Sequence, residues 1–144
     1  MSQTMNIVDA DFEIKAPLAL PEDEVQVRRL DLEAVRDAES RWQAVLSSDE
    51  ATRASRFHFP DDRQRYVATR AWLRTILAGY LATDAKCLNF FYSKKEKPSL
   101  GPVDAGVDVT FNVSHSGEIA LLAFARRREM YVRHGRLSLG DDRT

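Results

Sequence analysis

The sequence predicts an α+β fold, and two segments carry this prediction. Residues 60–81 begin with proline and hold apolar residues at helical spacing, which is typical of a long helix. Residues 109–124 consist of two strand-like runs joined by a turn, which is typical of an antiparallel hairpin. An alternating run at residues 25–30 adds a strand before the helix. The order of strand, helices, strand and hairpin is an α+β arrangement.

The part of the chain before the long helix is expected to contain a leader, one strand and two shorter helices. Residues 1–10 have the character of a disordered leader, whereas Val25–Leu30 alternates as a strand does. Residues 32–46 carry apolar side chains at helical spacing. Ser47–Glu50 supplies N-cap residues for a short helix that ends near Phe57.

The predicted long helix has clear signals at its start. Pro60 suits the first turn, because its missing N–H would be unpaired there in any case. Asp61 and Asp62 place negative charge at the positive end of the helix dipole. Three arginines fall together on one face of this helix, which predicts a solvated or subunit-facing stripe: Arg63, Arg70 and Arg74.

The connection between the long helix and the hairpin is expected to be mostly irregular. Residues 84–88 predict a short helical turn, residues 89–93 a strand and residues 94–102 a loop. Four aromatic residues in and around these segments are predicted to be core rather than base-stacking platforms: Trp72, Phe90, Phe91 and Phe111.

The hairpin contains the most informative run of the chain. In its first strand, apolar residues alternate with polar ones, and residues 116–118 form the turn. This arrangement places Ser114, His115 and Ser116 together where a core strand reaches the surface. Two hydroxyls and an imidazole at such a position can bind a phosphate.

Length and composition predict a single folded domain. The chain has 144 residues, of which 44% are apolar and 30% are charged, as in a globular protein. It has no apolar stretch of the roughly 20 residues that a membrane span needs, and its first residues lack a signal pattern. The lone Cys87 excludes an internal disulfide and a cysteine-rich metal site. These features predict a cytoplasmic location and no membrane partner.

The charge distribution argues against nucleic acid as a partner. The net charge is −1, so no overall field attracts a long polyanion. Basic residues nevertheless gather in residues 53–74, 94–97 and 126–136. Local basic clusters in a near-neutral chain indicate a small anionic ligand, and a solvated face is the alternative for each cluster.

Several short runs follow one another along residues 25–125. They are Arg53–Phe59, Asp62–Arg65, Ala71–Arg74, Lys97-Pro98 and Phe111-Asn112-Val113-Ser114-His115-Ser116. Together they resemble the 4′-phosphopantetheinyl transferases of the surfactin-synthetase-activating type, whose hairpin motif is Phe-Asn-(Val/Leu/Ile)-Ser-His-Ser. Each run alone is weak, but their order and spacing are specific to that family.

The resemblance implies a fold, an activity and a set of binding residues. The fold would be one α+β subdomain of a pseudo-twofold structure, over residues 11–125, with a long helix packed on an antiparallel sheet. Members of the family transfer phosphopantetheine from coenzyme A to a serine of an acyl or peptidyl carrier protein, with magnesium on the pyrophosphate. By resemblance, the residues that bind coenzyme A are Arg53, Arg65, Lys94, Lys95, Lys97, Asn112, Ser114 and His115. The alternatives are a solvated turn for the lysines and surface ion pairs, with Asp61 or Glu50, for the arginines.

The sequence departs from the family pattern in two places. Glu96 stands where the family has the glycine of a Gly-Lys-Pro loop, which puts a carboxylate beside the expected phosphate site. The magnesium motif Gly-(Val/Ile)-Asp-(Val/Ile)-Glu and the later Trp-x-x-Lys-Glu motif do not occur. Gly106–Val109 imitates the first of them but precedes the hairpin, so it is interpreted as a surface linker. No metal ligand and no catalytic residue is therefore assigned.

Residues 126–144 form a tail that is unlike the family, polar and rich in arginine. A frameshift or premature stop in a longer gene is the hypothesis for its origin, and an ordinary disordered tail is the alternative. The chain is thus predicted to be an N-terminal half that is inactive alone, with an exposed apolar face that invites self-association. Two alternatives are a non-catalytic remnant that binds coenzyme A or a carrier protein, and a partner of a separate C-terminal half. A nucleic-acid-binding protein has the least support, because no such motif occurs.

A hydrolase of the Ser–His type is rejected. Adjacent residues of a strand point to opposite faces, so His115 is poorly placed to act as the base for Ser114. The Gly-x-Ser-x-Gly turn that exposes a nucleophilic serine does not occur either.

Overall fold

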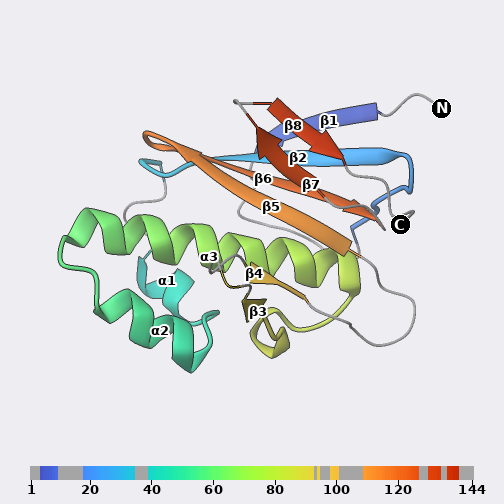
Figure 1. Cartoon of the computed structure of the whole chain (residues 1–144). Coiled ribbons are helices and arrows are strands. Elements are labelled where there is room, and N and C mark those ends of the chain that lie inside the picture. Colours follow the sequence, from blue (N-terminus) through green and yellow to red (C-terminus); the bar gives the residue numbers. More distant parts are fainter. Residues whose placement is uncertain are drawn as a thin grey trace.

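The chain folds into layers around one central helix, α3 (Pro60–Leu81). The computed structural model describes residues 4–9, 18–34, 39–92, 94, 98–100, 109–126, 130–133 and 136–139. A four-stranded sheet lies on one side of α3, and the smaller helices and a two-stranded pair lie on the other (Figure 1). The predicted α+β class, with a long helix packed on a largely antiparallel sheet, is confirmed. Within the described residues, no helix is both long and apolar enough to cross a membrane.

The main sheet has the strand order β1-β2-β6-β5. Strands β2 (Glu24–Asp31), β6 (Ile119–Arg126) and β5 (Val109–Ser116) pair in antiparallel fashion, as the sequence predicts. Gly117 has φ 60° in the turn between β5 and β6, a left-handed conformation that glycine adopts without steric cost. The predicted hairpin is therefore present, with the run around His115 at its tip.

Strand β1 (Thr4–Asp9) corrects the prediction of a disordered leader over residues 1–10. It pairs in parallel with β2, from Thr4 opposite Glu24 to Asp9 opposite Arg29. Without it, β2 would present a full row of unpaired backbone groups at the edge of the sheet. The residues that pair include Met5, Ile7 and Val8, whose apolar character suits a short strand.

Helix α3 begins and ends where the sequence predicts, but its surroundings differ from the prediction. It is buried on most of its circumference, because the sheet covers one side while α1 (Glu39–Gln43) and α2 (Ser48–Ser55) cover another. The stripe of arginines is consequently not solvated along its length. Arg74 is only 2% exposed, which makes the prediction for this residue wrong.

The structure confirms the predicted start of α2, but it contains only part of the helix predicted over residues 32–46. α2 has the predicted N-cap: the Glu50 N–H donates to Ser47 Oγ at 3.3 Å, and the Ser47 N–H donates to Glu50 Oε1 at 3.0 Å. The helix predicted over residues 32–46 is present in the described residues only as α1, and residues 32–34 form a turn. Trp42 from α1 still reaches the core, with its ring centroid 5.5 Å from that of Trp72.

The remaining elements are short. The predicted helical turn is present as η2 (Ala85–Cys87), and the predicted strand at residues 89–93 shrinks to β3 (Phe91–Tyr92), which pairs with β4 (Pro98–Ser99). Phe91 is 55% exposed, so the prediction that it is a core residue is wrong, because a two-residue strand outside the main sheet has an uncovered face. Within the predicted tail, β7 (Met130–Arg133) and β8 (Arg136–Leu139) form a hairpin, and β7 contacts β5.

The C-terminus of α3 offers a simple test of the fold. Ala82 follows the helix in a left-handed conformation, with φ 52° and ψ 48°, a position that usually holds glycine. We expect Ala82→Gly to raise the free energy of unfolding by about 0.5–1 kcal/mol, since an L-residue pays a steric cost there. Ala51→Gly, in exposed α2, should lower it by about 1 kcal/mol. Urea denaturation of both variants measures the two values, and a loss of stability in Ala82→Gly would contradict the assigned conformation.

Candidate functional site

A cavity of about 460 Å³ lies between the first half of α3 and the tip of the β5–β6 hairpin. α3 contributes Arg65, Tyr66 and Thr69, β5 contributes His115, and β4 contributes Pro98. Its apolar lining comes from Phe57, Leu73 and Val113. The cavity thus combines an apolar floor with a few polar groups, which is the usual make-up of a small-molecule site.

Arg65 is fixed at the mouth of this cavity by two carboxylates. Its guanidinium forms ion pairs with Glu118, in the hairpin turn, and with Asp62 at 3.3 Å. The hydrogen bond to Glu118, assisted by both negative charges, raises the pKa of Arg65 above its ordinary value. Its Nε–H has no hydrogen-bond partner among the described residues. This N–H is buried, so an anionic ligand would reach it only after a shift of the side chain.

Two hydroxyls add to the unused hydrogen-bonding capacity of the cavity. The hydroxyls of Tyr66 and Thr69 are buried and have no partner among the described residues. In the same helix the Thr75 hydroxyl donates to the Ala71 carbonyl at 2.8 Å, so the lack of such a bond at Thr69 is specific to that position. Buried polar groups of this kind are normally satisfied, and a ligand or water in the cavity would reach these two only after a shift of the side chains.

His115 lies near the end of β5, opposite Ala120. His115 is an exposed residue, but partial desolvation of its imidazole disfavours the charged form and lowers the pKa of His115 below the ordinary value of 6.5. Val113 and His115 both line the cavity, and successive residues of a strand point to opposite faces. Asn112, which is buried, and Ser114 therefore lie on the other face of β5.

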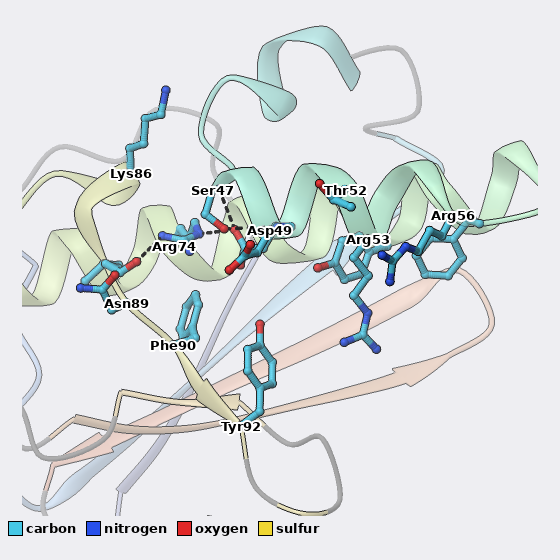
Figure 2. Close-up of a pocket in the computed structure, with 14 residues that line it drawn as sticks. Ser47, Asp49, Thr52, Arg53, Arg56, Arg74, Lys86, Asn89, Phe90 and Tyr92 are labelled. Carbon is cyan, nitrogen blue, oxygen red and sulfur yellow. Dashed lines mark hydrogen bonds and ion pairs between the residues drawn. The ribbon is translucent and has the colours of Figure 1, made fainter.

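Arg53 lies apart from Arg65 and His115, in a second hollow of about 700 Å³ beside α2. Figure 2 shows Arg53 extending from α2 on the side of the Tyr92 ring, with Arg56 just after the end of the helix. The Arg53 guanidinium lies 5.7 Å from the ring centroid of Tyr66, a cation–π arrangement. Two residues line both hollows, so the hollows adjoin: Phe57 and Tyr66.

Only one of the three lysines predicted to bind coenzyme A lies within the described residues. Lys94 is exposed and lines neither hollow. Lys95 and Lys97 lie outside the described residues. Of the eight predicted ligand residues, the structure brings Arg65 and His115 into one cavity and Arg53 into the adjoining hollow.

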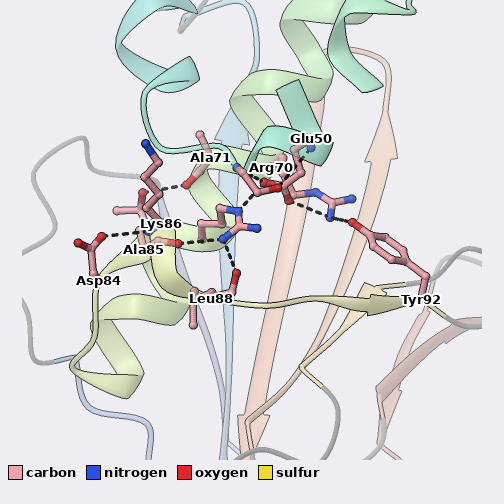
Figure 3. A network of polar contacts seen from close by, with 11 residues as sticks. Glu50, Arg70, Ala71, Asp84, Ala85, Lys86, Leu88 and Tyr92 are labelled. Atoms are coloured by element: carbon pink, nitrogen blue, oxygen red, sulfur yellow. Dashed lines mark hydrogen bonds and ion pairs between the residues drawn. The ribbon is translucent and has the colours of Figure 1, made fainter. Parts of the chain in front are cut away.

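A buried ion pair next to the second hollow was not predicted from the sequence. Arg74 Nε donates to Glu50 Oε1 at 2.5 Å, and Arg74 Nη1 donates to the carbonyls of Ala85 and Leu88 at 3.0 and 2.7 Å (Figure 3). Arg70 extends from the same carboxylate, at 3.4 Å, to the hydroxyl of Tyr92, at 2.8 Å. These contacts join α2, α3, η2 and β3. The sequence contains one indication that Arg74 is buried: the residues of α3 on both sides of it are apolar, which is typical of a helix that is buried all round.

The described residues contain no group of three His, Cys, Asp or Glu side chains that could hold a metal ion. The carboxylates beside the first cavity, Asp62 and Glu118, both pair with Arg65. Within the described residues, these two carboxylates are therefore engaged by an arginine.

Several known proteins and one family model are similar to this chain. The family model described as "4′-phosphopantetheinyl transferase, N-terminal" matches residues 35–127. The chain is 41% identical over 115 residues to the 4′-phosphopantetheinyl transferase HetI of Nostoc sp., covering 80% of this chain and 48% of HetI. The protein slr0495 of Synechocystis sp. is 36% identical over 91 residues, covering 63% of this chain and 37% of slr0495. A phosphopantetheinyl transferase of Thraustochytrium sp. is 32% identical over 83 residues, covering 58% and 28%.

The fold thus defines an α+β domain with a cavity between its long helix and the tip of its hairpin. The chain belongs to the 4′-phosphopantetheinyl transferase family, and its matched residues correspond to the N-terminal part of that family. The family prediction is confirmed, whereas the surfactin-synthetase-activating subtype stays a prediction. The chain spans about half the length of HetI, or 48%.

Proposed function

We propose that this chain binds coenzyme A as the N-terminal part of a 4′-phosphopantetheinyl transferase, an enzyme that transfers phosphopantetheine to a carrier-protein serine. One observation carries the proposal: Arg65 and His115, from separate elements, line one cavity together with Pro98. The carrier protein as partner and a cytoplasmic location belong to the same proposal.

The chemistry of the cavity suits the phosphorylated nucleotide end of coenzyme A. Arg65 offers a fixed positive charge with an unused N–H, and His115 becomes a second cation when an anion stabilises its protonated form. The hydroxyls of Tyr66 and Thr69 can donate to ligand oxygens or ring nitrogens. Arg53, Lys94, Lys95 and Lys97 remain proposed contacts on the strength of the family motif. Asn112 and Ser114 belong to the motif too, but they lie on the face of β5 opposite the cavity, so the motif alone supports them.

Magnesium is implied by the family, but the described residues do not fit it, because they contain no cluster of ligating carboxylates. The residues of this chain have the tasks of binding and orienting the nucleotide. A non-catalytic module that binds coenzyme A, or that pairs with a separate C-terminal half, is the second candidate function, and the same cavity supports it.

Binding of coenzyme A tests the proposal. Charge-assisted hydrogen bonds contribute about 1.5–3 kcal/mol each when well formed. Two or three of them, less the cost of association, predict a Kd in the roughly millimolar to high-micromolar range without magnesium. We expect His115→Ala and Lys97→Ala each to weaken binding several-fold in calorimetry, and dephospho-coenzyme A to bind worse than coenzyme A. Arg41→Ala, which removes a positive charge from exposed α1, is the control and should change nothing.

The same titration has a pH dependence whose sign follows from His115. Its pKa is lowered in the free protein, so the imidazole is mostly neutral above about pH 7. A bound phosphate favours the charged imidazole, so binding takes up a proton and affinity rises as the pH falls from about 8 to about 6. His115→Ala should flatten this slope, and the ligand's own titration cancels in the comparison.

Equal binding of coenzyme A and its dephospho form would show the phosphate assignment to be wrong.

A further inference from the structure

Arg70 occupies a position between the two hollows that the proposed function does not explain. It lies in the middle of α3, lines the first cavity, and its side chain is 12% exposed. Its guanidinium lies 5.5, 5.3 and 5.8 Å from the ring centroids of Tyr66, Phe90 and Tyr92. One nitrogen, Nη1, donates to the Tyr92 hydroxyl at 2.8 Å and to Glu50 at 3.4 Å. Arg70 therefore holds Tyr92 by its hydroxyl and by its ring.

The inner end of this arrangement is rigid. Glu50 is buried and accepts from Arg74 at 2.5 Å and from the Ser47 N–H at 3.0 Å. Arg74 is itself fixed by the carbonyls of Ala85 and Leu88. The carboxylate that holds Arg70 thus cannot move without breaking the contacts of α2 and η2 (Figure 3).

The outer end of the arrangement is a strand pair that needs support. β3 and β4 contribute two residues each, with Phe91 opposite Ser99 and Tyr92 opposite Pro98. A two-stranded pair of this size is marginal on its own in water. Tyr92 is the last residue of β3, and its partner Pro98 lines the cavity that also contains Arg65 and His115. A shift of Tyr92 would therefore move one wall of the cavity.

We propose that Arg70 is a positioning residue for the coenzyme A cavity: through the Tyr92 hydroxyl it holds the β3–β4 pair, and with it the Pro98 wall, in place. The inference rests on the proposed function for the identity of the ligand. The anchoring of the β3–β4 pair by Arg70 is independent of the proposed function. A lysine cannot replace this arginine, because its single ammonium group lacks the planar shape of a guanidinium. It cannot lie against the aromatic rings and also bond to both Glu50 and Tyr92.

Tyr92→Phe is the sharpest variant, because Tyr92 is half-exposed and does not line the cavity. It removes only the hydroxyl and keeps the ring. We expect the melting temperature to stay within about 2 °C, since removal of one exposed hydrogen bond changes stability little. We expect amide hydrogen exchange of Phe91, Tyr92 and Ser99 to quicken several-fold, and the Kd for coenzyme A to rise about three- to tenfold.

Arg70→Lys should reproduce both effects, and the double variant should be no worse than either single one, because the two residues act as one unit. Arg63→Lys, seven residues earlier in α3, is the matched control and should change neither quantity. Unchanged exchange in Tyr92→Phe and in Arg70→Lys would overturn the anchoring. Faster exchange with an unchanged Kd would overturn the effect on the cavity. If the unaltered chain fails to bind coenzyme A, the proposed function falls, while hydrogen exchange still decides the anchoring.

Discussion

We expect the Arg74→Ala variant to lose about 3–5 kcal/mol of unfolding free energy, because it leaves Glu50 as an unpaired buried charge. It also leaves the carbonyls of Ala85 and Leu88 without their donor. A domain of this size has about 5–15 kcal/mol in total, so much of the population would unfold under mild conditions. The contacts that fail would be those that join α2 and η2 to α3.

Urea denaturation of three variants separates the causes. The double variant Glu50→Gln with Arg74→Met removes both charges but still leaves the two carbonyls without Arg74. It should therefore be more stable than Arg74→Ala, and the difference reports the unpaired charge together with the cavity that alanine leaves. Arg63→Ala, on a less buried part of α3, should lose little. If Arg74→Ala were as stable as Arg63→Ala, the buried ion pair would have no structural importance.

The elements that the sequence predicted well are those with local signals. α3 begins at Pro60 because the ring and the following aspartates favour a helix start, and these causes act within one turn. The β5–β6 hairpin likewise follows from alternation and from Gly117 in the turn. Neither element needs a distant partner in order to be recognised.

The errors have a common physical origin in contacts between distant segments. Arg74 is buried because Glu50, 24 residues earlier, approaches it, and a helical wheel of α3 alone cannot show this. β1 forms because β2 has an open edge, which depends on the strand order rather than on residues 4–9 themselves. Phe91 is exposed because β3 stands outside the main sheet.

The candidate site was predictable in part for the same reason. The family motif identified the tip of β5, and Arg65 reaches it because Glu118 in the hairpin turn pairs with this arginine. A motif read as a string does not say which face of a strand each residue occupies. His115 faces the cavity, whereas Asn112 and Ser114 occupy the opposite face of β5. Tyr66 and Thr69 were missed, since their role depends on hydroxyls that lack a partner in the folded chain.

The second prediction with a large effect concerns the transfer of phosphopantetheine to a carrier protein. Assayed on their own with magnesium, coenzyme A and an apo carrier protein, these 144 residues are expected to give no detectable product. In the reaction, the serine hydroxyl attacks the β-phosphate of coenzyme A, loses its proton and expels 3′,5′-ADP. Attack on a pyrophosphate requires its negative charge to be neutralised in the transition state. The sequence contains neither the Asp-x-Glu run after the hairpin nor the Trp-x-x-Lys-Glu run that serve this purpose in the family.

Mass spectrometry of the carrier protein measures this outcome, because the added phosphopantetheine changes its mass. HetI serves as the positive control under the same conditions, and a preparation from a host without its own transferase removes the main source of false product. Coenzyme A binding by the same preparation must be retained, which separates a missing reaction from a misfolded sample. In the proposed site, Arg65 and His115 would hold the nucleotide by donating hydrogen bonds to its phosphates. Neither can deprotonate the serine while it is charged and bound to phosphate. Robust conversion that scales with protein concentration would therefore show that residues other than the family's acidic motifs supply the charge neutralisation and the base.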